Sequence, residues 1–388
     1  PDRADGYHLT EDLVDQSIAY IGNHRQSSPE NPFFLYLALG ACHFPYHVPA
    51  DYMARYSGNY NSGWDELRKG RYARQRELRV LPAHAELAPR NPGVPAWADL
   101  SGDEKRFAAR TQEAYAGFLH HSDDQLQRLV DFLEKSNELD DTILIVLSDN
   151  GAGSWAPPAG RLDVHRAVYI NSEPIEELML NIDKVGTAES QPSYSPGWAQ
   201  ASNTPLKWYK GNTYGGGTRA PLIIHWPNGD IPNGQILNQY HHAIDIAPSL
   251  LQMIGEAEPA ASGAPALPLQ GVSMAYTLDQ PQAATRKTLQ HFETSGDRAI
   301  WVDGWKAVTK HQSGDSFDQD KWALYHARED FSEINDLAEQ RPEHLKKLVD
   351  LWRDEAVRND VLPMEDDLSE LFARVAPKPR AQYVLSLI

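Results

Sequence analysis

Cysteine, positive charge and long apolar runs are all scarce in this chain of 388 residues. The single cysteine, Cys42, excludes an intrachain disulfide and a thiolate metal cluster. No apolar run approaches the roughly 18 residues of a membrane-spanning helix, so the sequence predicts no membrane span. The net charge of −18 disfavours nucleic acid and anionic membranes as partners. An anionic small substrate would therefore need local positive charge at its own site.

Short apolar runs alternate with helical patterns over the first two thirds of the chain. Apolar residues recur at helical spacing within residues 10–21 and 104–135. Uninterrupted apolar runs at 33–39, 142–147 and within 219–227 are typical of strands covered on both faces. This alternation predicts an α/β fold, with a large mixed, mostly parallel sheet flanked by helices.

The remaining third has a different pattern. A Pro- and Ala-rich stretch at 256–271 indicates a boundary between two units. Short strand patterns follow within 287–326, where Asp303-Gly304 is a strong hairpin signal, and a helical pattern covers 341–357. We therefore predict an α/β domain over residues 1–268 and a small antiparallel sheet with one helix over 269–388.

The apolar run at 142–147 leads through Ser148 into a carboxylate and an amide. In open α/β sheets, ligands bind beyond the carboxyl ends of the strands. Asp149 and Asn150 offer one anionic and one neutral oxygen, a pair that suits Ca²⁺ or Mg²⁺. The alternative is an ordinary strand-ending turn, in which Asp and Asn are common.

Two further segments near predicted strands carry candidate site residues. His43 lies in "CHFPYHVP", where an imidazole can protonate a leaving group near neutral pH. Lys210 precedes Gly215, Gly216 and Gly217 in "KGNTYGGGTRAP", and glycines allow close approach of backbone to a ligand. Each has an ordinary alternative, namely a solvent-facing histidine and a solvated lysine on a flexible loop.

Together these segments resemble the sulfatase family of the alkaline phosphatase superfamily. The likeness is carried, in the family's order, by "FFLYLALGACHFPYHVP", "TILIVLSDNGA", "KGNTYGGGTRAPLIIHWP", "HHAIDIAPSLL", "LQGVSM" and "WALYHAREDFSEINDLA". Phrases at 63–68, 197–199 and 203–205 are similar to those of bacterial arylsulfatases. The resemblance implies an alkaline-phosphatase-like fold and hydrolysis of sulfate esters, aryl sulfates above all.

The resemblance also implies a role for each candidate residue. Asp149 and Asn150 would be two ligands of Ca²⁺, with Mg²⁺ as the alternative. Lys210 would contact the sulfate and its bridging oxygen, and His43 would help to protonate the leaving group. The nucleophile of such enzymes is a formylglycine made from Cys or Ser in a C/S-x-P/A-x-R motif. A formylglycine-generating or anaerobic sulfatase-maturating enzyme is then the expected partner, and a small sulfate ester the expected substrate.

The chain departs from the family pattern at two places. The lysine loop is usually written K-G-x-x-x-E-G-G-x-R-x-P, and Gly215 stands where the glutamate is expected. Cys42 is followed by His-Phe-Pro-Tyr, which is not a formylglycine precursor, and the family's upstream Asp ligands and Lys-x-His pair are missing. We expect that the chain is truncated at its N-terminus, that it is inactive alone, and that any export signal lies in the absent segment. Its compartment, cytoplasm or periplasm, therefore stays open.

Two alternatives remain at this point. The first is a phosphodiesterase or phosphonate monoester hydrolase of the same superfamily. The sequence of the absent nucleophile segment would distinguish such an enzyme from a sulfatase. The second is a non-catalytic relative that keeps the fold as a binding module. The joint presence of His43, Asp149, Asn150 and Lys210 favours an enzyme.

Overall fold

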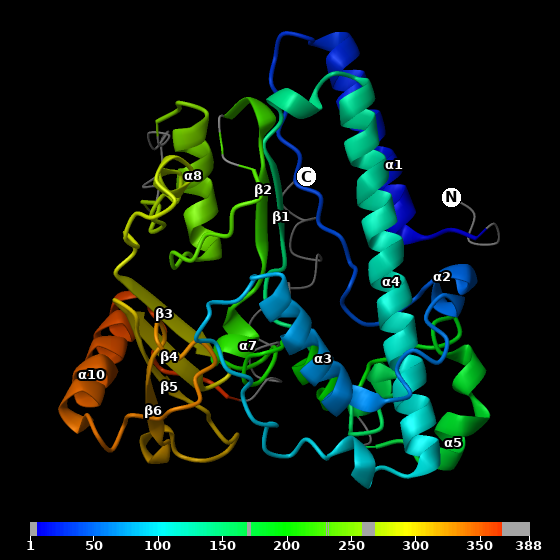
Figure 1. The fold of residues 1–388 in the computed structure, drawn as a ribbon, viewed down its shortest axis with the longest axis vertical. Coiled ribbons are helices and arrows are strands. Elements are labelled where there is room, and N and C mark those ends of the chain that lie inside the picture. Colours follow the sequence, from blue (N-terminus) through cyan, green and yellow to red (C-terminus); the bar gives the residue numbers. More distant parts are fainter. Residues whose placement is uncertain (1–5, 169–171, 230, 232, 258–267, 367–388) are drawn as a thin grey trace, which may run out of the picture. The chain divides into compact units, whose positions relative to one another are not determined.

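The structure is a computed structural model that describes residues 6–168, 172–229, 231, 233–257 and 268–366 (Figure 1). The chain forms two compact units. Unit 1 comprises Pro1–Leu81, Arg90–Pro205 and Ala220–Gln235, and unit 2 comprises Pro82–Pro89, Leu206–Arg219 and Ile236–Ile388. No helix in the described part is long and apolar enough to cross a membrane. The predicted domain boundary at residue 268 adjoins residues outside the described part and stays a prediction.

Two long helices form the core of unit 1. Helix α1 (Leu9–Ser27) packs along α4 (Gly102–Lys135), and buried Val14, Ile21, Leu129 and Leu133 meet between them (Figure 1). The α4 helix begins with a capping box, in which the Ser101 hydroxyl accepts from the Glu104 amide and the Glu104 carboxylate accepts from the Ser101 amide. Both helices were predicted from apolar spacing, and both are confirmed.

Shorter helices surround this pair. In unit 1 they are α2 (Ala50–Ala54), α3 (Gly63–Glu77), α5 (Ile175–Leu180) and α6 (Pro196–Ser202). The indole of Trp198 on α6 is fully buried and donates a hydrogen bond to the Ala108 carbonyl of α4 at 2.8 Å. This contact fixes α6 against α4, and the segment that follows α6 leads to the lysine loop.

The predicted strand at residues 33–39 is wrong for the described structure, because these residues pair with no other strand. Their exposure alternates: Phe33, Leu35 and Leu37 pack on the α1–α4 core, whereas Phe34 and Tyr36 are 82% and 81% exposed. A strand needs a neighbour to satisfy its backbone hydrogen bonds, and none of the described segments supplies one here.

The two remaining apolar runs of unit 1 do form strands. β1 (Leu144–Leu147) pairs antiparallel with β2 (Leu222–His225), with Leu144 opposite His225 and Leu147 opposite Leu222. The predicted burial on both faces is wrong within the described residues, since Val146, Leu147, Leu222 and Ile223 are exposed. A face of a sheet is buried only where another element packs on it, and the described elements leave these four side chains uncovered.

Unit 2 contains the predicted small antiparallel sheet, with strand order β3 (Leu289–Thr294), β4 (Asp297–Val302), β5 (Trp305–Thr309) and β6 (Trp322–His326). Asp303 and Gly304 join β4 to β5 with positive φ angles of 48° and 93°, as a two-residue hairpin requires. Unit 2 also holds α7 (Gly215–Thr218), α8 (Ile246–Met253), α9 (Tyr276–Asp279) and α10 (Pro342–Arg358).

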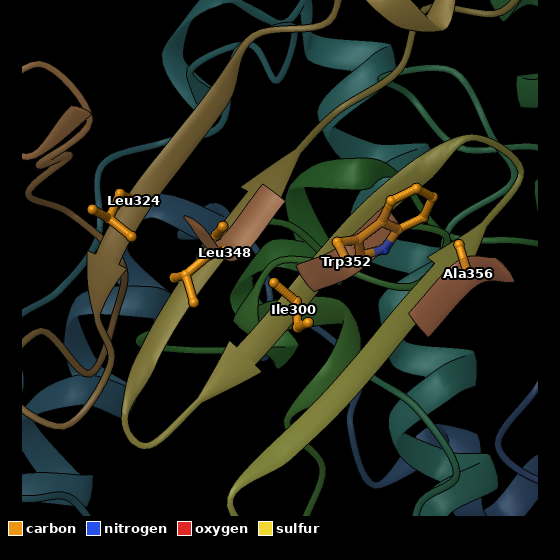
Figure 2. Close-up of a cluster of buried hydrophobic side chains, with 6 residues drawn as sticks. Ile300, Leu324, Leu348, Trp352 and Ala356 are labelled. Atoms are coloured by element: carbon orange, nitrogen blue, oxygen red, sulfur yellow. The ribbon is translucent and has the colours of Figure 1, made fainter. Parts of the chain in front are cut away.

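Helix α10 covers one face of this sheet. Figure 2 shows Leu348, Trp352 and Ala356 of the helix above Ile300 and Leu324 of the strands. The Trp352 indole also donates a hydrogen bond to the Phe292 carbonyl at 3.0 Å, which anchors the helix to β3. The prediction of one covering helix is confirmed.

Candidate active site

His43 lies on an exposed turn of unit 1 with one ring nitrogen already engaged. Its Nδ1 donates a hydrogen bond to the Phe44 carbonyl at 2.7 Å, and its ring lies 4.1 Å from the Phe44 ring, centroid to centroid. A carbonyl only accepts, so Nδ1 carries the proton. The other nitrogen, Nε2, makes no hydrogen bond with the described residues. The imidazole is therefore oriented, with Nε2 available to a ligand.

Cys42, beside His43, is a half-buried thiol without a disulfide partner. Burial raises the pKa of this thiol to about 11. The thiolate is the reactive form of cysteine, so a thiol with this pKa stays protonated and inert near neutral pH. This result agrees with the sequence motif, which lacks the pattern of a formylglycine precursor.

Asp149 and Asn150 follow β1 after one intervening residue, Ser148, on a backbone that is held in place. The Ser148 amide donates to the Pro221 carbonyl at 3.3 Å and so extends the β1–β2 ladder by one residue. Beyond the pair, the Ala152 amide donates to the Asn203 side-chain oxygen at 2.9 Å. The side chains of Asp149 and Asn150 make no hydrogen bond or ion pair with the described residues. Their oxygens are therefore available on a fixed backbone.

These two oxygens fit part of a Ca²⁺ or Mg²⁺ site. The donor chemistry is right for a hard cation, which takes six to eight oxygens as Ca²⁺ or about six as Mg²⁺. Among the described residues no cluster of three or more His, Cys, Asp or Glu side chains could hold a metal ion. Two oxygens are fewer than such a shell requires, so Asp149 and Asn150 can form only part of a site of this kind.

Lys210 belongs to unit 2, on the loop that leads into α7. Its side chain is exposed and forms no hydrogen bond or ion pair with the described residues. The loop backbone is closed by a hydrogen bond from the Gly216 amide to the Lys207 carbonyl at 2.7 Å. A Cβ atom on Gly216 would lie 2.1 Å from the Trp208 carbonyl oxygen, so only glycine allows this closure.

Glu333 is a residue of this region that the sequence analysis missed. Its Oε2 accepts a hydrogen bond from the Gly215 amide at 2.8 Å, and its Oε1 lies 2.6 Å from the Lys306 ammonium. Both side chains of the ion pair are buried. Glu333 lies 118 positions from Gly215, and no spacing in the sequence signals such a contact.

The structure thus brings some predicted residues together and leaves others apart. Asp149 and Asn150 share one fixed turn. His43 contacts neither of them by hydrogen bond or ring stacking, but its neighbour Phe44 packs against Trp155, five residues beyond Asn150, with ring centroids 6.1 Å apart. Lys210 belongs to unit 2.

A cavity in unit 1 has several tyrosine rings in its lining. Its volume is about 440 Å³, and its lining includes Tyr56, Tyr60, Tyr115 and Arg71. The Tyr115 ring also packs on Tyr46, three residues after His43, at a centroid distance of 5.5 Å. One ring of the cavity lining therefore contacts a buried residue of the segment that carries His43.

Comparison with known proteins gives consistent matches. The family model described as Sulfatase matches residues 1–256. An uncharacterised sulfatase of Schizosaccharomyces pombe is 30% identical over 370 residues, which is 93% of this chain and 63% of that protein. An arylsulfatase of Klebsiella aerogenes is 28% identical over 274 residues, 70% of this chain and 56% of that protein. The chain thus spans about 60% of the length of these relatives.

Solved structures with the same fold include Ps i-CgsB in complex with k-i-k-neocarrahexaose, with a TM-score of 0.57 and 20% identity, over 97% of this chain and 61% of that one. Another is the phosphonate monoester hydrolase of Silicibacter pomeroyi, with a TM-score of 0.51 and 18% identity, over 93% of this chain and 62% of that one. These likenesses confirm the alkaline-phosphatase-like fold that the sequence predicts.

Proposed function

Because the chain belongs to the sulfatase family, we propose that the protein is a hydrolase of sulfate esters, with aryl sulfates as its substrates. One observation carries this proposal. Asp149, Asn150, Lys210 and Nε2 of His43 are all free of partners among the described residues, while hydrogen bonds fix the backbone around them. Polar groups that have no protein partner but stand on fixed backbone are open to a substrate or a cation, which is what this proposal requires of them.

In the proposed mechanism, Lys210 binds the sulfate and its bridging oxygen. Its positive charge offsets the negative charge that develops on these oxygens as the sulfur–oxygen bond breaks. In its imidazolium form, with a proton on each ring nitrogen, His43 gives the Nε2 proton to the departing alcohol oxygen, while the hydrogen bond from Nδ1 to Phe44 holds the ring in orientation. These two side chains supply local positive charge in a chain whose net charge is −18.

Asp149 and Asn150 would hold Ca²⁺, or Mg²⁺ in the alternative. A bound cation at this position would supply further positive charge to the sulfate oxygens. The formylglycine nucleophile is part of the proposal as well. We propose that a part of the protein outside this chain carries it, since residues 1–388 contain no C/S-x-P/A-x-R motif. A formylglycine-generating or anaerobic sulfatase-maturating enzyme would then be needed to mature the protein.

The proposed aryl specificity draws on two observations. The Klebsiella relative is named an arylsulfatase, and the cavity of unit 1 has tyrosine rings in its wall. Aromatic walls favour offset-stacked or edge-to-face contacts with a phenyl ring, worth about 0.5–1.5 kcal/mol per pair. The alcohol part of the substrate is accordingly proposed to lie against Tyr56, Tyr60 and Tyr115.

The test uses protein expressed from its full coding sequence together with a maturating enzyme. We expect hydrolysis of 4-nitrophenyl sulfate, loss of that activity in Lys210→Ala, and little activity on 4-nitrophenyl phenylphosphonate. A preference for the phosphonate would favour the phosphonate hydrolase alternative. Binding of the sulfate without turnover would favour the non-catalytic alternative. Residues 1–388 alone are expected to show no turnover, and robust turnover by them would contradict the placement of the nucleophile.

A further inference from the structure

The carboxylate of Glu333 is buried between two groups of unit 2. Oε2 accepts from the Gly215 amide at 2.8 Å, and Oε1 contacts the Lys306 ammonium at 2.6 Å. Glu333 and Lys306 are only 4% and 5% exposed. Burial lowers the pKa of Lys306, and the Glu333 carboxylate opposes that shift. Both carboxylate oxygens are thus committed, one to strand β5 and one to the first residue of α7.

The absence of a side chain at Gly215 leaves room for the Glu333 carboxylate. A Cβ atom built on Gly215 would lie 3.6 Å from Cδ of Glu333, at ordinary van der Waals distance. The Glu333 carboxylate therefore occupies the space into which a side chain at position 215 would extend. Position 215 is also where the lysine-loop pattern has glutamate and this chain has glycine. A carboxylate is thus present at this place, but it comes from a distant residue.

Glu333 is itself held by a rigid turn. The Asp330 carboxylate accepts hydrogen bonds from the Ile334 amide at 2.9 Å and the Asn335 amide at 2.7 Å. Glu333 has a φ of 57°, in the left-handed region that few non-glycine residues adopt. The Ser332 hydroxyl donates to the Glu86 carbonyl at 2.6 Å. These contacts aim the Glu333 side chain at α7.

The first turn of α7 connects Glu333 to the loop that carries Lys210. The Gly216 amide bonds the Lys207 carbonyl at 2.7 Å, and the Tyr214 amide bonds the Asn212 side-chain oxygen at 3.2 Å. Lys210 lies between Lys207 and Asn212. Fixing the amide of Gly215 therefore fixes the neighbours that close the loop on both sides of Lys210.

We propose that Glu333 is a positioning residue: it anchors the start of α7 through the Gly215 amide and so holds the loop that presents Lys210. This inference rests on the proposed function in so far as Lys210 binds sulfate. Its structural part, the anchoring of residues 207–217 by Glu333, stands without any assumption about the reaction.

The experiment compares two double variants that remove the same pair of charges. Lys306→Met with Glu333→Gln keeps an oxygen that can accept from the Gly215 amide, whereas Lys306→Met with Glu333→Ala removes that acceptor. Because neither variant leaves a buried unpaired charge, both are expected to fold. Glu329→Ala, which removes a carboxylate that is 83% exposed on the same segment, is the matched control.

Hydrogen exchange of the amides of residues 207–217 is the first measurement. We expect exchange to be about five- to tenfold faster in the Glu333→Ala double variant than in the Glu333→Gln double variant, the effect of losing one hydrogen bond. The second measurement is kcat on 4-nitrophenyl sulfate for the full protein. We expect kcat to be about 10- to 100-fold lower in the Glu333→Ala double variant, with a smaller change in KM, because the lysine is misplaced.

Equal exchange in the two double variants would overturn the anchoring role. Unequal exchange with equal kcat would overturn the effect on Lys210. Absence of sulfatase turnover in the wild type would contradict the proposed function instead, and the exchange comparison would still decide whether Glu333 holds the loop.

Discussion

Nδ1 of His43 donates a hydrogen bond to the carbonyl of Phe44 at a distance of 2.7 Å. This bond fixes the tautomer of the neutral ring, with the proton on Nδ1 and none on Nε2. The candidate acid and the residue that orients its ring are thus neighbours in the chain, and this orientation needs no partner from another element.

The first prediction concerns the leaving group. If His43 protonates the departing oxygen, His43→Gln lowers kcat/KM most for sulfate esters of weakly acidic phenols and alcohols, by about 10²–10⁴-fold. For 4-nitrophenyl sulfate, whose leaving group needs less assistance, we expect a smaller loss. The measurement is kcat/KM across a series of phenyl sulfates. A loss of equal size for every ester would contradict a role as acid. His84→Gln, at an exposed histidine, is the control.

Metal retention tests the proposed role of Asp149 and Asn150 as cation ligands. We expect Asp149→Ala to abolish both bound Ca²⁺ or Mg²⁺ and sulfatase activity in the full protein, because a hard-cation site loses its anionic ligand. Metal content of the purified protein is measured by elemental analysis beside the rate. Survival of both metal and rate would show that Asp149 belongs to an ordinary turn. Asp140→Ala, at another exposed aspartate near β1, is expected to change neither.

Two adjacent glycines are predicted to differ in their tolerance of alanine. A Cβ atom on Gly216 would lie 2.1 Å from the Trp208 carbonyl oxygen, whereas one on Gly215 finds no atom closer than 3.5 Å. Gly216→Ala should therefore lower the free energy of unfolding by about 1–3 kcal/mol or more. Gly215→Ala should leave that free energy nearly unchanged. Chemical denaturation of both variants measures the difference, and equal effects would show that the loop adapts.

The contact between Glu333 and Gly215 predicts that substitutions at positions 215 and 333 are energetically coupled. Gly215→Glu places a second carboxylate beside that of Glu333, so we expect it to destabilise the wild type. In the Glu333→Ala background the same substitution should stabilise the protein, because the new carboxylate can pair with Lys306. A double-mutant cycle on the free energy of unfolding should give a coupling of about 0.5–3 kcal/mol. Additive effects would place the two side chains in separate environments.

The thiol of Cys42 should be slow to react. With a pKa of about 11, its thiolate fraction at pH 8 is far below that of an ordinary cysteine, whose pKa is about 8.5. We expect iodoacetamide to alkylate the folded protein at pH 8 about 10²-fold more slowly than the unfolded chain. The rate should rise as the pH approaches 11.

The raised thiol pKa also fixes the sign of a pH effect on stability. The folded state retains this proton to higher pH than the unfolded state does. The stability contributed by the neutral thiol is therefore fully present below the unfolded thiol pKa and is lost as the pH rises toward 11. Cys42→Ser should remove this component of the alkaline loss of stability. Mass analysis of the matured protein should find Cys42 unconverted, whatever happens to the true nucleophile.

Short sequence patterns were enough to predict several helices and one hairpin of this protein. The spacing of apolar residues sufficed for α1, α4 and α10, and the Asp303-Gly304 pair sufficed for the hairpin between β4 and β5. These elements follow from interactions between residues that are close in the chain, which is why their sequence signals are strong. The candidate residues His43, Asp149, Asn150 and Lys210 were likewise visible, because each lies within a short motif.

Tertiary structure decided what those patterns left open. An uninterrupted apolar run carries no alternation that specifies its neighbour or its direction, and so the antiparallel pairing of β1 with β2 was not predictable. The run at 33–39 looks equally suited to a strand, but no described segment pairs with it, and Phe34 and Tyr36 stay exposed. The carboxylate beside Gly215 comes from Glu333, 118 positions away, and only the folding of unit 2 brings the two together.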